Sequence, residues 1–150
     1  MTDLPLAQRL HRKGHWHGPA ADWVRLDYEA RFLRRKRLET GAGHPLLVDL
    51  AQTTSLDHGD ALELEDGRLV EVLAAPEPLL EIRGDLPRLA WHVGNRHTPC
   101  QVMPDRLLIR ADHVLREMLE RLGAELAETE APFTPEGGAY GHGRTHSHEH

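Results

Sequence analysis

The hydrophobic pattern of the sequence changes at one segment, "AAPEPLL" at residues 74–80, where Pro76 and Pro78 stand two positions apart. Proline lacks a backbone N–H and its ring clashes with the preceding helical turn, so no helix runs through this segment. Apolar runs with a period of two precede it, and apolar residues at helical spacing follow it. The segment therefore predicts a junction between two small domains, which a chain of 150 residues is long enough to form.

The half before the junction carries the pattern of an antiparallel sheet, with strand signals from Leu26 to Leu73. The best signal is "ALELEDGRLVEVL", in which Asp66-Gly67 separates two alternating runs. Asp-Gly is favoured in tight hairpin turns, and alternation places every second side chain on one face. One buried face is therefore expected, with Leu62 and Leu64 opposite Leu69 or Val70 and Val72.

The half after the junction mixes helices with strands. Residues 85–97, "DLPRLAWHVGNRH", place apolar residues on one helical face, with Asp85 as N-cap and Pro87 in the first turn. A second helix is expected to begin after Asp112 as N-cap and to end at Gly123. Strands are expected at Leu79–Ile82, Thr98–Met103, Arg106–Arg110 and 124–130.

The resulting order of elements is strand, helix, strand, strand, helix, strand, which is the ferredoxin-like pattern. Past Phe133 the composition turns to Pro, Gly and His, which bury too little apolar surface to fold alone. We therefore predict an α+β protein with an all-β domain at 1–75, a ferredoxin-like domain at 76–140 and a flexible histidine-rich tail at 141–150.

Composition restricts the classes of function. The formal net charge of -6 argues against a general binder of nucleic acid and suits cationic partners. Cys100 is the single cysteine, so an intramolecular disulfide framework is excluded, and no apolar run has the length of a membrane helix. The opening "MTDLPLAQRLHRKG" lacks the apolar centre of a secretory signal, so a cytoplasmic protein is expected.

Histidine is the anomaly of the composition, with 12 residues in the chain. Neutral imidazole is a common ligand of nickel, copper and zinc. A purification tag would be a uniform block, whereas "GHGRTHSHEH" is interrupted by five other residue types, which favours native metal binding. The candidate tail ligands are His142, His146, His148 and His150.

Three further histidines lie within the second domain. His92 and His97 are five residues apart on the expected helix, so at about 100° per residue they point roughly 140° apart and do not chelate one ion. His97 extends the apolar stripe at the helix end, either as a ligand or as a capping or core histidine bonded to a carbonyl. His113, in the first turn of the second helix, is a ligand candidate or a solvated residue.

Three segments carry a resemblance to a known family. They are "WHVGNRHTPCQV" at 91–102, "DHVLREMLERLGAEL" at 112–126 and "PFTPEGGAYGHGRTHSHEH" at the end of the chain. With "RRKRLETG", "HGDALELEDG" and "VLAAPEPLLEI" they resemble the urease accessory protein E family, the nickel metallochaperones of urease maturation. The resemblance spans residues 25–150.

The resemblance implies a β-rich N-terminal domain similar to a peptide-binding module and a homodimer joined through the metal-binding domain. It implies that His97 meets its symmetry mate to bind Ni²⁺, with His92, His113 and the tail histidines as further candidate ligands. It also implies that a urease maturation GTPase and the urease accessory complex receive the metal. The sequence departs from the pattern at Ala111, where relatives often carry a histidine, and Cys100 is outside the pattern.

Three other functions compete with this one. A Cys100–His97 pair would suggest a thiol enzyme, but no orienting acid or oxyanion donor can be named, so we predict no enzyme. The basic stretch "RFLRRKR" at 31–37 suggests nucleic-acid binding, a solvated strand with Phe32 and Leu33 turned to the core, or contact with an acidic partner. A general zinc or copper buffer is also possible, because copper exceeds nickel and zinc in the usual affinity order.

Overall fold

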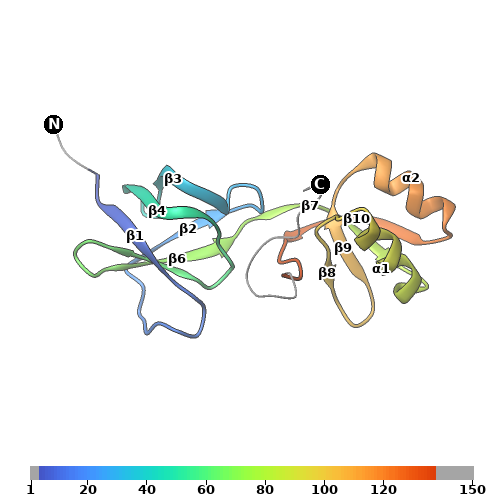
Figure 1. Ribbon diagram of the computed structural model, residues 1–150, viewed down its shortest axis with the longest axis horizontal. Coiled ribbons are helices and arrows are strands. Elements are labelled where there is room, and N and C mark those ends of the chain that lie inside the picture. Colours follow the sequence, from blue (N-terminus) through green and yellow to red (C-terminus); the bar gives the residue numbers. More distant parts are fainter. Residues whose placement is uncertain (1–3, 138–150) are drawn as a thin grey trace. The chain divides into compact units, whose positions relative to one another are not determined.

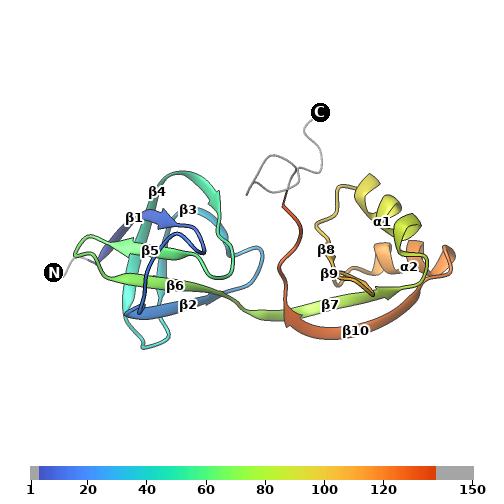
Figure 2. The ribbon, with the colours of Figure 1, turned by 90° about the horizontal axis from the view of Figure 1, so that it is seen from below.

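A computed structural model describes residues 4–137 of the chain. It divides the chain into two compact units, Met1–Ala75 and Pro76–His150. Figure 1 and Figure 2 together label their elements, and each unit has its own hydrophobic core. The tail predicted at 141–150 lies outside the described residues. Within the described part of the chain, every helix is too short or too polar to cross a membrane.

The first unit is a six-stranded sheet in the order β2-β6-β5-β1-β4-β3. The pairs β1–β4 and β2–β6 are parallel, and the other three pairs are antiparallel. The strand signals of the sequence begin only at Leu26, so β1 and most of β2 precede them. The strands are β1 (Leu6–His11), β2 (Asp22–Leu26), β3 (Phe32–Glu39), β4 (Pro45–Ser55), β5 (Ala61–Leu64) and β6 (Leu69–Ala74).

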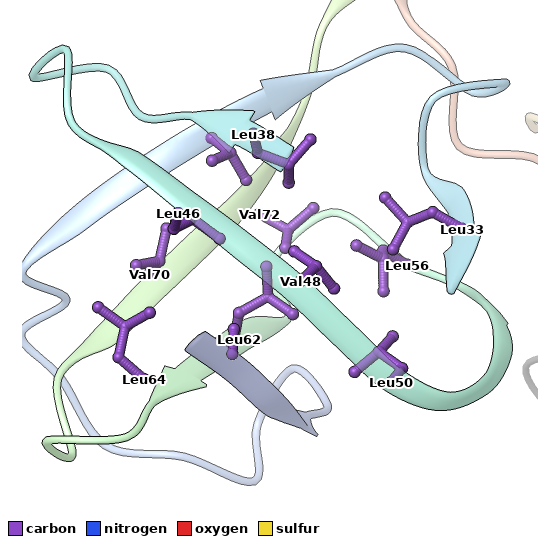
Figure 3. Packing of buried hydrophobic residues seen from close by; sticks show 12 residues of the cluster. Leu33, Leu38, Leu46, Val48, Leu50, Leu56, Leu62, Leu64, Val70 and Val72 are labelled. Carbon is purple, nitrogen blue, oxygen red and sulfur yellow. The ribbon is translucent and has the colours of Figure 1, made fainter. Parts of the chain in front are cut away.

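The hairpin predicted at Asp66-Gly67 joins β5 to β6. Gly67 has a φ of 90°, a conformation that glycine adopts without steric cost, and its N–H donates to the Leu64 carbonyl at 2.9 Å. Leu62 pairs with Val70, and both are buried with Leu64 and Val72, so the predicted alternation is confirmed. Figure 3 shows these side chains converging with residues of β3 and β4 into one core.

The start of β3 differs from the expectation. Leu33 is buried as predicted, but Phe32 is 48% exposed, because adjacent side chains of a strand point to opposite faces. The interior position is taken by Arg31, which is buried and donates from Nε to the Leu56 carbonyl at 3.1 Å and from a terminal nitrogen to the Leu26 carbonyl at 3.0 Å. One of the five basic residues in this stretch is therefore structural.

The second unit is a four-stranded sheet in the order β10-β7-β9-β8, with every neighbouring pair antiparallel. Its elements follow in the order that the sequence predicts. Figure 2 shows both helices on one face of the sheet, where they form a core with the strands. The elements are β7 (Pro76–Arg83), α1 (Leu86–Asn95), β8 (Gln101–Val102), β9 (Leu107–Arg110), α2 (His113–Arg121) and β10 (Glu125–Pro132).

Several predicted boundaries in this unit are wrong. The strand expected at Thr98–Met103 is reduced to two residues, and the last strand continues to Pro132. Helix α1 ends at Asn95, so His97 lies beyond it rather than on it. The capping prediction holds for α2, where Asp112 Oδ1 accepts from the Val114 N–H at 2.8 Å and the Leu115 N–H at 3.1 Å, whereas Asp85 makes no side-chain cap bond at α1.

Candidate metal centre

His97 is fixed by an uncommon backbone conformation directly after α1. Its φ is 57°, the only positive value among the non-glycine residues of the described chain. The His97 N–H donates to the Gly94 carbonyl at 2.9 Å and the Thr98 N–H to the Val93 carbonyl at 3.4 Å, so the loop folds back on the last helical turn. These two bonds form a Schellman motif with His97 at the C′ position, where the left-handed conformation is common and is usually taken by glycine.

The prediction that His97 extends the apolar stripe of the helix is therefore wrong. The chain reverses at Arg96, whose N–H bonds to the Val93 carbonyl at 3.2 Å, and the buried stripe ends with Val93 itself. His97 is half-buried instead of packed in the core. Its imidazole is therefore partly exposed to solvent, while its backbone helps to close the end of α1.

His97 lines an open hollow of about 490 Å³ in the second unit. The hollow lies where the loop after α1 meets the start of β7 and the connection between β9 and α2. Its wall carries two arginines and two acids, so its charge is mixed. The other lining residues are Glu77, Pro78, Arg96, Thr98, Pro99, Arg110, Ala111, Asp112 and Leu115.

Two other histidines of this unit lie within residues 4–137, and the structure places both outside the lining of the hollow. His92 is in the last turn of α1, with its ring edge-on to Trp91 at 5.0 Å between centroids and 86° between planes. His113 is the exposed first residue of α2, next to Asp112 of the hollow. His92, His97 and His113 are thus not brought together as one set of ligands.

A complete set of donors is also missing from the described part of a single chain. Within residues 4–137, no three His, Cys, Asp or Glu side chains gather in an arrangement that could hold a metal ion. His142, His146, His148 and His150 lie outside these residues. A site built on His97 therefore requires donors from the rest of the chain or from a second copy.

Glu77 is a residue of the hollow that sequence reasoning missed. Glu77 is the second residue of strand β7, twenty positions before His97, and both residues line the same hollow. No local signal marks Glu77, because its position depends on the pairing of β7 with β9 and β10. Only a three-dimensional structure could have found it.

Cys100 lacks the properties of a catalytic thiol. Burial, together with the negative charge of Glu136, raises the pKa of the Cys100 thiol from 9.0 to about 11. The side chain packs against the core of the second unit, and its Sγ lies 3.9 Å from the Gln101 carbonyl. A protonated thiol is a weak nucleophile and a weak metal ligand, so Cys100 is a packing residue.

Comparison with known proteins covers both units. The family model described as "UreE urease accessory protein, N-terminal domain" matches residues 5–75, and the model for the C-terminal domain matches residues 77–150.

Curated relatives named "Urease accessory protein UreE" are similar over nearly the whole chain. The protein from Cereibacter sphaeroides is 64% identical over 150 residues, which are 100% of this chain and 82% of the relative. The protein from Ruegeria pomeroyi is 62% identical over 149 residues, 99% of each chain. That from Paracoccus denitrificans is 58% identical over 142 residues, 95% of this chain and 90% of the relative. Both domain models and these relatives agree: the chain belongs to the UreE family of urease accessory proteins.

Proposed function

We propose that this protein is a metallochaperone that collects Ni²⁺ and delivers it to the urease maturation complex for assembly of the urease nickel centre. Membership of a urease accessory family supports the role in urease maturation. The metal is a cargo in this role, so the protein needs a site that binds and releases an ion and needs no catalytic group. The raised pKa of the Cys100 thiol disfavours the alternative of a thiol enzyme.

The observation that carries the metal site is the position of His97. Its left-handed backbone holds one imidazole beside a surface hollow, and the described residues of one chain offer no set of three donors. We propose that two copies of His97 meet across a twofold axis and bind one ion between them, because a residue that lies beside such an axis faces its own copy in the other subunit.

Exposed apolar side chains in the second unit support a homodimer. Trp91 on α1 is 64% exposed, Val102 on β8 is 53% exposed and Val114 on α2 is 54% exposed. Exposed large apolar side chains are available for contact with a second copy. We infer that the dimer forms through this unit.

The remaining histidines have supporting roles in this proposal. His142, His146, His148 and His150 collect Ni²⁺ weakly and raise its concentration near His97. His92 and His113 are auxiliary ligands. The protein acts in the cytoplasm, where a urease maturation GTPase and the urease accessory complex receive the ion.

We also infer what each domain contributes. The second domain, at 76–140, has the ferredoxin-like arrangement. The strand order β10-β7-β9-β8, with antiparallel neighbours, supports this inference. The first, at 1–75, is a partner-binding domain. The division of the chain after Ala75 supports this separation of roles.

Purification of the untagged protein from cells grown with added nickel tests the proposal. Metal analysis should find Ni²⁺ in the protein, and urease maturation proteins should be recovered with it. Recovery of zinc or copper alone, without those proteins, would contradict nickel delivery and favour a general zinc or copper buffer. The basis of this alternative is the higher affinity of copper for nitrogen ligands.

A further inference from the structure

Strand β3 is an open edge of the first unit's sheet. It is the last strand in the order and pairs with β4 only. Between Arg34 and Arg37 all side chains are exposed. Such an edge presents unpaired backbone groups that accept a further strand.

The register shows which backbone groups point outward. The Thr40 N–H donates to the His44 carbonyl at 2.9 Å, so these two residues form a hydrogen-bonded pair of the β3–β4 ladder. In an antiparallel ladder every second pair is hydrogen-bonded, so the pairs Leu38–Leu46 and Lys36–Val48 are hydrogen-bonded too. The residues of β3 between these pairs therefore direct their backbone N–H and C=O groups away from β4. Arg37 is one of these residues.

The opposite strand gives the same result independently. The Leu47 N–H donates to the Pro5 carbonyl at 2.9 Å, so the backbone of Leu47 faces away from β3, and Leu47 pairs with Arg37. In an antiparallel ladder the two members of such a pair turn their backbone groups in opposite directions. The N–H and C=O of Arg37 thus point outward, away from β4.

The charges of this edge are only partly neutralised. Arg34 and Arg35 share Asp49, at 3.5 Å and 3.0 Å from its carboxylate oxygens. Lys36 and Arg37 have no acidic partner in the part of the chain that the structure describes. Two unpaired positive charges therefore lie beside outward backbone groups, on a chain whose formal net charge is -6.

We propose that the outer edge of β3 binds an acidic, extended segment of a partner protein by strand addition, with Arg37 as the central contact. Backbone bonds would supply affinity, and the carboxylates of the segment would pair with Lys36 and Arg37. A peptide fits better than a nucleic acid, because the net negative charge of the chain repels a long polyanion and strand addition uses backbone groups that a nucleic acid lacks. The inference rests on the proposed partner-binding role of the first domain and is independent of the metal site.

The test uses the full chain in metal-free buffer and a fluorescent peptide of about ten residues built from repeats of two glutamates and two valines, so that carboxylates lie on both faces of the added strand, beside Lys36 and beside Arg37. Fluorescence anisotropy would compare Arg37→Ala, which removes the charge, with Arg37→Pro, which also removes the outward N–H and is tolerated at an edge. We expect affinity to fall about threefold in the first variant and about tenfold in the second. Arg121→Ala, which removes an exposed charge from α2 in the other unit, is the matched control and should bind normally.

Amide hydrogen exchange in the wild-type protein, with and without the peptide, tests strand addition even if Arg37→Pro fails to fold. Binding of the peptide should slow exchange at Arg35 and Arg37, whereas the amides of Lys36 and Leu38, already bonded to β4, should change little. Exchange rates at all four amides that do not change when the peptide binds would overturn strand addition at β3. The first domain would then bind its partner through another surface. Tighter binding of the matching lysine peptide, or of single-stranded oligothymidine, would overturn the acidic peptide as the ligand. Self-association of Arg37→Ala without peptide binding would show that the charges only protect the edge.

Discussion

At the scale of single residues, Cys100 shows how burial decides chemistry. The sequence places this cysteine three positions after His97, a spacing that suggests a thiol enzyme. In the structure, burial raises the pKa of the thiol to about 11. At about pH 8 the thiolate fraction should be roughly 100-fold lower than for a thiol at the ordinary value of 9.0. Iodoacetamide should therefore alkylate the folded protein at least that much more slowly than the same chain in denaturant. Equal rates in the two states would show that the thiol is open and reactive.

His97 illustrates the limit of sequence reasoning at this scale. The residue was identified as a candidate ligand from its motif, but its place on the helix was wrong. Nothing in "GNRH" shows that the helix stops at Asn95 and that a histidine takes a φ of 57°. That conformation depends on bonds back to Val93 and Gly94 and on the loop's path to β8.

At the scale of elements, two aspartates that look alike in the sequence differ in the structure. Asp112 caps α2 through two backbone N–H groups, whereas the Asp85 side chain makes no cap bond at α1, where Pro87 at the second position has no N–H to donate. Asp112→Ala should lower the free energy of unfolding by about 1 kcal/mol, and Asp85→Ala by less than about 0.5 kcal/mol. Denaturant unfolding of both variants measures the difference, and equal losses would contradict the capping account.

Elements were predictable where a local signal sets them. The hairpin at Asp66-Gly67 and the cap of α2 follow from turn and capping chemistry, so sequence alone located both. Strand β1, "LAQRLH", has too few alternating apolar residues for a pattern, and its strand conformation depends on pairing with β4 and β5, which are distant in the sequence. The two-residue β8 is likewise set by its partner β9.

At the scale of the whole molecule, the last ten residues should contribute metal capacity and no stability. Residues 141–150 contain four histidines and no apolar side chain, so they have no apolar surface to bury on folding. A chain ending at Tyr140 should bind fewer nickel ions in equilibrium dialysis and keep its melting temperature and its dimer in sedimentation. A monomeric truncated chain would show instead that the tail holds the dimer together.

Nickel binding by the whole protein should depend steeply on pH. An imidazole must be neutral to bind a metal, and its ordinary pKa is about 6.5, so protons compete with Ni²⁺ as the pH falls. Affinity should be close to constant above about pH 7.5 and should fall sharply below about pH 6. Calorimetric titrations at about pH 8 and about pH 5.5 compare the two regimes, and equal affinities would argue against histidine ligation.

The intersubunit site of His97 is the central claim, and equilibrium dialysis of the chain ending at Tyr140 tests it most directly. A site on a twofold axis requires about one firmly bound Ni²⁺ per two chains, and His97→Ala should abolish it. The fold should remain, because His97 is only half-buried and substitutions at the surface usually change stability by about 0.5 kcal/mol or less. His92→Ala should weaken the firm binding far less, and His113→Ala should have an intermediate effect at most, because both auxiliary histidines lie outside the lining of the hollow. Full firm binding by the His97→Ala variant would contradict the account.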